Sequence, residues 1–192
     1  GEGGTAIDSV RTPVTEKASD TTINQIAEVL LKQGKKTALL LGRRVLLEEG
    51  LIAASRLAEK TGAKLFTEVF PTRLERGAGL PSVERIAYLA EMATVQLTGY
   101  DHLVIIDTKE PVSFFAYPGK KSYLVPDGCT AHHLVEPHQD ALGSLHALVS
   151  AVNAETTEPK LQQAKRPKLP SGKLNAAKVC QAIGALMPEH AI

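Results

Sequence analysis

Apolar residues recur with helical spacing between Ile23 and Leu31. This i, i+3, i+4 stripe predicts a helix that packs one face against a core, capped by one of the polar residues at 20–22. Gly34 is expected to end the helix in the left-handed conformation. The next apolar run, Thr37–Leu41, is short and uninterrupted, which favours a strand that is covered on both faces of a parallel sheet.

The chain up to residue 152 continues to alternate between these two patterns. Further strands are predicted at residues 63–67, 102–106, 122–125 and 132–135, and further helices at residues 47–60, 82–97 and 139–152. Gly62 and Gly99 are expected to end two of these helices. Strands that alternate with helices of this length are typical of right-handed βαβ units. We therefore expect an α/β fold: a doubly wound, mostly parallel, Rossmann-like sheet of about six strands with helices on both faces.

Polar segments divide the chain into four parts. Residues 1–18 lack periodicity and are predicted to be an N-terminal linker, which leaves residues 19–152 as the Rossmann-like domain. Residues 153–173 are polar, contain three prolines and the basic run KRPK, and are predicted to be a solvated linker. Residues 174–192 then contain a helix capped by Asn175 that leads towards an apolar end. We expect this last part to be the start of a further, truncated domain.

Composition narrows the class of protein. Apolar residues make up 43% of the chain and charged residues 22%, with a net charge of +1, so we expect neither a nucleic acid nor a membrane as partner. The start of the chain has no signal-peptide pattern, and the longest apolar run, residues 38–41, is far shorter than the ~20 residues of a membrane helix. Cys129 and Cys180 lie far apart and are expected to be free thiols. The sequence thus indicates a cytoplasmic protein.

Two predicted strands are followed by charged residues that suit a nucleotide. Gly42, Arg43 and Arg44 follow the first strand, and Asp107 follows the strand at 102–106. Ligands of doubly wound sheets lie beyond the carboxyl ends of strands, where arginines can bind a pyrophosphate and a carboxylate can accept from a ribose. These four residues form the candidate cofactor-binding site. The GxGxxG fingerprint is absent, and a tight turn with solvated arginines is the competing interpretation.

Two further motifs that resemble metal-binding sites are better explained by structural roles. Residues 126–128 (PDG), followed by Asn153, resemble a Gly-Asp-Gly…Asn motif for magnesium and diphosphate. Proline replaces the first glycine and a strand pattern follows it, so we predict a turn. His132 and His133 would point to opposite faces of a strand, and we predict no metal site. No hydrolase motif is present either, so we do not expect hydrolase chemistry.

Longer blocks of sequence resemble a known family. These are TALLLG, LAEKTGAKLFTE and DHLVIIDTKEPVSFFAYPGKKSYLVPDG, in this order, with KLNAAKVCQAIGALMPEHAI at the end. Together they resemble the central domain of thiamine-diphosphate-dependent enzymes of the acetolactate synthase large-subunit type. The final block is similar to the segment that opens the next, diphosphate-binding domain in that family. The resemblance extends from about Thr22 to Ile192, although none of its blocks is a catalytic motif.

The resemblance implies a domain fragment that is a scaffold, with no catalytic residue and no activity of its own. The parent would be a transferase or lyase that ligates or decarboxylates 2-oxo acids with thiamine diphosphate and Mg²⁺ bound outside this fragment. Its partners would be flanking domains and further copies of the parent chain. The central domain binds FAD in some members and ADP or nothing in others, and TKEPV after Asp107 replaces an arginine-containing stretch, which disfavours FAD. The alternative is a stand-alone ADP- or FAD-binding module.

Overall fold

The computed structural model describes residues 15–188, whose centre is a five-stranded sheet. All neighbouring strands are parallel, in the order β3-β2-β1-β4-β5. The strands are β1 (Thr37–Leu41), β2 (Lys64–Thr67), β3 (Glu84–Arg85), β4 (His102–Ile106) and β5 (Thr130–His133). Leu39 of β1 lies level with Leu65 of β2 and Val104 of β4. The predicted parallel α/β fold is confirmed, with five strands among the described residues instead of about six.

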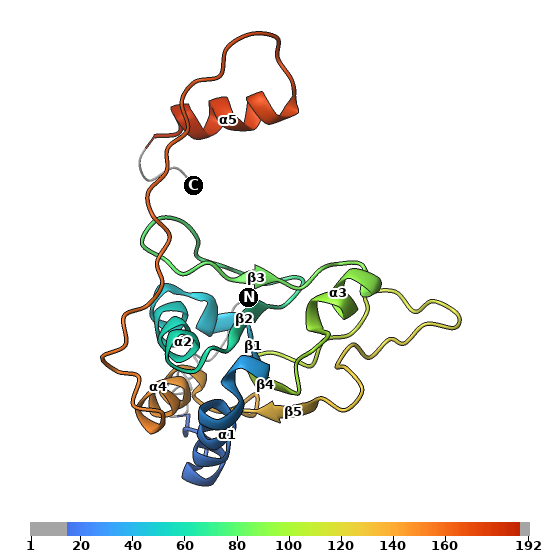
Figure 1. Cartoon of the computed structure of the whole chain (residues 1–192), viewed down its shortest axis with the longest axis vertical. Helices are drawn as coiled ribbons and strands as arrows, with labels where there is room; N and C mark the ends of the chain where they lie inside the picture. Colours follow the sequence, from blue (N-terminus) through green and yellow to red (C-terminus); the bar gives the residue numbers. More distant parts are fainter. Residues whose placement is uncertain (1–14, 189–192) are drawn as a thin grey trace, which may run out of the picture.

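Helices cover both faces of this sheet, as predicted (Figure 1). The helices α1 (Asp20–Gln33), α2 (Glu48–Thr61) and α4 (Ala141–Ala151) lie on one face, and α3 (Ala90–Leu97) lies on the other. Every side chain of β1 is buried because alternate residues meet the two layers. Leu39 packs towards α1, α2 and α4, and Leu40 packs towards α3 and the buried Leu124. The uninterrupted apolar run of β1 therefore forms the centre of the fold.

Several local predictions were wrong. The helix predicted at residues 82–97 begins only at Ala90, because Glu84 and Arg85 pair with β2 as an edge strand. Residues 122–125 form no strand: Tyr123 makes an isolated bridge, and Leu124 is buried from a loop. Gly34 is right-handed (φ −52°) and starts a short 3₁₀ turn instead of ending α1 in the left-handed region. Gly62 (φ 81°) does end α2 as predicted.

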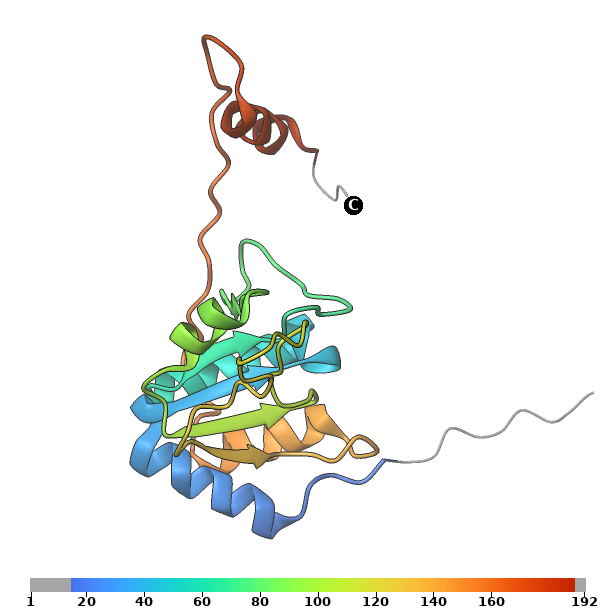
Figure 2. The same ribbon diagram turned by 90° about the vertical axis from the view of Figure 1, so that its right-hand side faces the viewer.

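The segment after α4 is first attached to the domain and then leaves it. The backbone N–H of Lys160 donates to Ser55 Oγ at 3.0 Å, and the N–H of Gln162 donates to the Leu80 carbonyl at 3.0 Å. Beyond this point an extended stretch leads to α5 (Ala176–Leu186), which stands away from the sheet (Figure 2). Asn175 caps α5 as predicted, and none of its residues is buried. Among residues 15–188, no helix is long and apolar enough to span a membrane.

Candidate functional site

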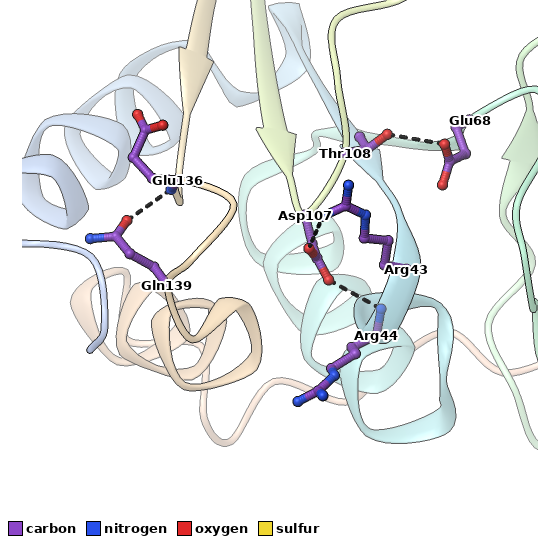
Figure 3. A network of polar contacts seen from close by, with 7 residues as sticks. All are labelled: Arg43, Arg44, Glu68, Asp107, Thr108, Glu136 and Gln139. Carbon is purple, nitrogen blue, oxygen red and sulfur yellow. Dashed lines mark hydrogen bonds and ion pairs between the residues drawn. The ribbon is translucent and has the colours of Figure 1, made fainter. Parts of the chain in front are cut away.

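The structure brings the four predicted site residues together at the carboxyl ends of β1 and β4: Gly42 lies against the Asp107 carbonyl, and Figure 3 shows Arg43, Arg44 and Asp107. The backbone N–H of Arg44 donates to Asp107 Oδ2 at 3.1 Å, and Arg43 Nη1 lies 3.7 Å from Asp107 Oδ1. The side chain of Arg44 points away from this carboxylate. In the strand order 3-2-1-4-5, β1 and β4 flank the point where the direction of winding reverses, which is where such folds bind ligands.

Two residues of this group have unusual backbone conformations. Arg43 (φ 43°) and Asp107 (φ 54°) both lie in the left-handed region, although neither is glycine. Such conformations cost energy and persist where surrounding contacts hold them. Here the contacts of Asp107 with the backbone of Arg44 and the side chain of Arg43 join the two strained turns to each other. The Asp107 carboxylate therefore links the turn that follows β1 to the turn that follows β4.

Burial governs the electrostatics of Asp107, whose side chain is 13% exposed. Desolvation raises the pKa of this carboxyl above its ordinary value, while the hydrogen bond from the Arg44 backbone and the charges of Arg43 and Arg44 oppose that rise. The carboxylate is thus partly neutralised by groups of its own chain. A ligand hydroxyl that donates to the Asp107 carboxylate would therefore compete with these two arginines for it.

The space that a bound pyrophosphate needs beside Gly42 is filled by protein. A Cβ at this position would lie 2.5 Å from Thr108 Cβ and 2.6 Å from the Asp107 carbonyl oxygen. Thr108 also donates its hydroxyl to Glu68 Oε2 at 3.2 Å (Figure 3). Gly42 is needed because two loops cross closely here. In dinucleotide-binding folds, by contrast, the glycine lets a phosphate approach the backbone.

The amino end of α2, the usual phosphate-binding point of this fold, is closed by a carboxylate of the chain. Glu75 Oε2 accepts from the backbone N–H of Glu48 at 2.6 Å, and Glu75 Oε1 pairs with Arg73 at 2.9 Å. Glu48 and Glu49 add negative charge to the first turn. Helix amino ends attract anions, but here the protein supplies its own. Glu75 could not be predicted from the sequence, because no local pattern links a loop residue to a helix 27 positions away.

Two clefts remain open around Asp107. One, of about 330 Å³, is bordered by Arg43, Lys109 and His133. The other, of about 410 Å³, lies between the two arginines and the amino end of α4, where the Asp140 side chain accepts from the backbone N–H of Gly143. Both have room for a polar ligand. However, the fit to FAD or ADP is poor, because the Glu48 N–H at the amino end of α2 and the Arg44 N–H already donate to carboxylates of the chain, and the loops leave no room beside Gly42.

The described residues also offer no metal centre. Within residues 15–188, no three His, Cys, Asp or Glu side chains are grouped so that they could hold an ion. Residues 126–129 form the predicted turn: the Cys129 N–H donates to the Pro126 carbonyl, and Gly128 has φ 82°. His132 bonds to His102 and the adjacent His133 to Glu110, both at 3.0 Å. Magnesium needs several oxygen ligands, so this part of the chain does not suit a Mg²⁺–diphosphate group.

Comparison with known proteins relates the chain to one third of a larger enzyme. No protein-family model matches it. Over 180 residues, 94% of its length, the chain is 45% identical to a protein of Mycobacterium tuberculosis (strain ATCC 25618 / H37Rv) provisionally described as an acetolactate synthase large subunit. This match covers 34% of the relative, so the chain spans about a third of that protein's length.

Two solved structures share the fold. One is a thiamin diphosphate-dependent enzyme from Mycobacterium smegmatis, again provisionally described, with TM-score 0.56 and 20% identity over 83% of this chain and 33% of that one. The other is a thiamine diphosphate-dependent 4-hydroxybenzoylformate decarboxylase from Rhodococcus jostii RHA1, with TM-score 0.58 and 19% identity over 88% and 33%. In sequence the chain is thus similar to a third of an acetolactate synthase-like protein, and its fold is similar to that of a domain in two thiamine-diphosphate-dependent enzymes.

Proposed function

We propose that this chain is the central domain of a larger enzyme that ligates or decarboxylates 2-oxo acids. The observation that carries the proposal is the 45% identity over 94% of the chain to a protein three times as long. When bound in such a parent, thiamine diphosphate supplies the carbanion chemistry of the reaction, which belongs to the cofactor and not to the protein. Because residues 15–188 offer it no metal site, we assign the cofactor and Mg²⁺ to the other domains.

The contribution of this chain is structural. The exposed face of α5 carries Val179, Ile183 and Leu186, which are 40%, 56% and 68% exposed. Exposed apolar surface of this kind marks a contact site, and we assign it to the domain that follows in the parent. Parents of this type would assemble as homo-oligomers through their flanking domains. The free state of Cys129 and Cys180 supports a cytoplasmic location.

A stand-alone nucleotide-binding module is the alternative. The strand order 3-2-1-4-5 and the clefts around Arg43 and Asp107 favour it. The carboxylate of Glu75 at the amino end of α2 and the crowding at Gly42 count against it. Under this alternative, Gly42, Arg43, Arg44 and Asp107 would hold ADP or FAD. Isothermal titration of the purified chain with both nucleotides separates the two functions, and micromolar affinity for either one would favour the module.

The decisive experiment starts from the gene. The reading frame around this segment is determined from genomic and transcript sequence, and the complete protein is purified. We expect release of CO₂ from pyruvate that depends on added thiamine diphosphate and Mg²⁺, and no activity from residues 1–192 alone. A complete protein that binds no thiamine diphosphate would refute the proposal. So would a reading frame that encodes nothing beyond this chain.

A further inference from the structure

Most of the aromatic side chains form one exposed cluster. Of four Phe and four Tyr, five lie here, with neighbouring ring centroids 4.8–6.0 Å apart. The members of this aromatic cluster are Phe70, Tyr88, Phe114, Phe115 and Tyr117, all between 44% and 60% exposed. Phenylalanine is one of the residues that folded proteins most often bury completely. The gathering of these rings on the surface therefore indicates contact with another molecule.

Part of the cluster lines a cleft of about 330 Å³ at the carboxyl ends of β1 and β2. Leu40 and Ile86, both 1% exposed, are the fully buried apolar side chains of its lining. Phe70 and Phe114 border it with their rings 5.3 Å apart at an angle of 66°. A concave apolar pocket at this end of a parallel sheet has the character of a small-molecule site. We call it the aromatic cleft.

Hydrogen bonds hold the two sides of the aromatic cleft in place. The Thr108 hydroxyl donates to Glu68 Oε2, which joins the loop after β4 to the loop after β2. Next to Phe114, the Ser113 N–H donates to the Ser122 carbonyl at 2.7 Å, which ties this part of the loop to its returning limb. The cleft is thus preformed by its own loops, which reduces the ordering cost of binding.

Carboxylates outnumber ammonium groups in the lining of the aromatic cleft. Glu68 and Glu110 are both half-buried, whereas Lys109, the basic residue that lines the cleft, is exposed to solvent. Solvent screens an exposed charge more strongly than a half-buried one, so the ammonium of Lys109 offsets only part of the field of the two carboxylates. Lys109 also borders the neighbouring cleft beside Arg43. The charges of the aromatic cleft therefore favour a cationic ligand over an anionic one.

Of the two carboxylates, Glu68 is the one that remains available to a ligand. Glu110 is paired with His133 at 3.0 Å, and this contact lowers the pKa of the Glu110 carboxyl. Glu68 accepts only from the neutral hydroxyl of Thr108, at 3.2 Å (Figure 3), and within residues 15–188 no cationic side chain lies within ion-pair distance of it. Carboxylates that are withdrawn from water are ordinarily paired. The described chain thus supplies no counterion for Glu68.

The aromatic walls favour a cation as well. The faces of aromatic rings carry partial negative charge and attract a cation within about 6 Å of the ring centroid. The protein already makes one such contact, since Lys64 Nζ lies 5.7 Å from the centroid of the Phe66 ring. In the cleft, Phe70 and Phe114 form a corner that can contact the alkyl groups of a ligand. A metal ion fits this corner poorly, because Mg²⁺ and Ca²⁺ need several oxygen ligands.

We propose that the aromatic cleft binds a small organic ammonium ion, whose alkyl groups pack on Phe70 and Phe114 and whose positive charge faces Glu68. Aromatic side chains recognise quaternary ammonium groups in this way. The half-buried position of Glu68 strengthens the attraction, because a charge in a less polar environment is screened less. The site does not rest on the proposed function, in which neither the aromatic cluster nor Glu68 has a part.

The test uses the purified 192-residue chain and backbone amide NMR with three probes. Choline carries a quaternary ammonium group. Its neutral analogue 3,3-dimethylbutan-1-ol has a carbon atom in place of the charged nitrogen and the same shape. Magnesium chloride offers a cation without alkyl groups. Comparison of the first two probes isolates the effect of charge, and comparison of the first and third isolates the effect of the alkyl groups.

Four variants locate the binding site. Glu68→Gln removes the charge and keeps an oxygen that can accept from Thr108. Phe114→Ala removes a wall of the cleft, and the control Tyr117→Ala removes a ring of the aromatic cluster that does not line the cleft. Lys109→Gln removes the opposing charge. The dispersion of each spectrum reports whether the variant is folded.

We expect choline to bind at millimolar concentration and to shift amides at 68–70 and 108–114. Its affinity should fall about tenfold in Glu68→Gln and in Phe114→Ala, stay unchanged in Tyr117→Ala and rise slightly in Lys109→Gln. The neutral alcohol and magnesium should bind about tenfold more weakly than choline, or less. The proposal is overturned if choline does not bind, if the alcohol binds as tightly, or if Glu68→Gln binds choline like wild type. Equal losses in Tyr117→Ala and Phe114→Ala would overturn it too. If Phe114→Ala does not fold, the alcohol and Glu68→Gln still decide.

Discussion

Replacing Glu75 by alanine tests how the amino end of α2 is closed. The variant loses the acceptor of the Glu48 N–H and a negative charge beside the helix end. Loss of such a cap costs about 1 kcal/mol, and loss of the charge–dipole interaction costs about 0.5 kcal/mol more. Repulsion between Glu75 and the acidic first turn, Glu48 and Glu49, offsets part of the second cost. We therefore expect the free energy of unfolding to fall by about 1–1.5 kcal/mol.

Urea unfolding followed by circular dichroism measures this loss directly. For a protein of this size, the melting temperature should fall by about 2–4 °C for each kcal/mol. Glu75→Gln is the matched variant, because it keeps an oxygen that can accept from the helix and loses only the charge. Its stability should lie between those of wild type and Glu75→Ala. The partner Arg73, 72% exposed, contributes little as a surface ion pair, so Arg73→Ala should be nearly neutral.

Three outcomes would refute this reasoning. Wild-type stability in Glu75→Ala would show that the 2.6 Å contact with the Glu48 N–H does not cap the helix. An equal loss in Glu75→Gln would assign the whole effect to charge. An equal loss in Arg73→Ala would assign it to the ion pair instead.

Three other measurements probe the rest of the fold. Gly34→Ala should lower the free energy of unfolding by about 1–3 kcal/mol in urea titration, since a Cβ there lies 2.1 Å from a backbone oxygen of α2. Burial, and then the charge of His102, lower the pKa of His132 below its ordinary 6.5, so the unfolded state binds the proton first as the pH falls. The free energy of unfolding should therefore drop as the pH falls below about 6.5. Urea unfolding midpoints measured above and below that pH give the size of the drop, which should be smaller in His132→Asn. Burial raises the pKa of the Cys129 thiol, so iodoacetamide should modify the exposed Cys180 first; mass spectrometry showing equal rates would contradict this.

The centre of the fold was predictable because its signals are local. Thr37–Leu41 is an uninterrupted apolar run, and the stripe between Ile23 and Leu31 has a clear helical period, so each segment indicates its own structure. The edge of the sheet was not predictable in this way. Ile86 fits the spacing of a helix, yet it is buried beside a two-residue strand that exists only through pairing with β2. Such pairing overrides local propensity.

For the candidate site, too, the position of the residues could be predicted from the sequence and their contacts could not. Arg43 and Asp107 both follow strands of a parallel sheet, so their position at the same edge, the carboxyl ends of the strands, could be predicted. Their left-handed backbones, and the hydrogen bond from Arg44 to Asp107 across 63 positions, depend on how two turns meet. The role of Glu75 depends on which groups the fold brings beside it, and a sequence without its fold contains no such information.

The attachment of Lys160 and Gln162 beside Leu80 has a consequence for larger assemblies. Near the start of the described chain, the Glu16 carbonyl accepts from the Asp140 N–H, next to α4 and the β5 side of the sheet. The chain thus arrives at one border of the sheet and departs at the other, beside β3 (Figure 2). With neighbouring strands ~4.8 Å apart, four intervals separate these borders by about 19 Å. The width of the sheet therefore sets the spacing between the two points at which the preceding and following segments of the chain are attached to it.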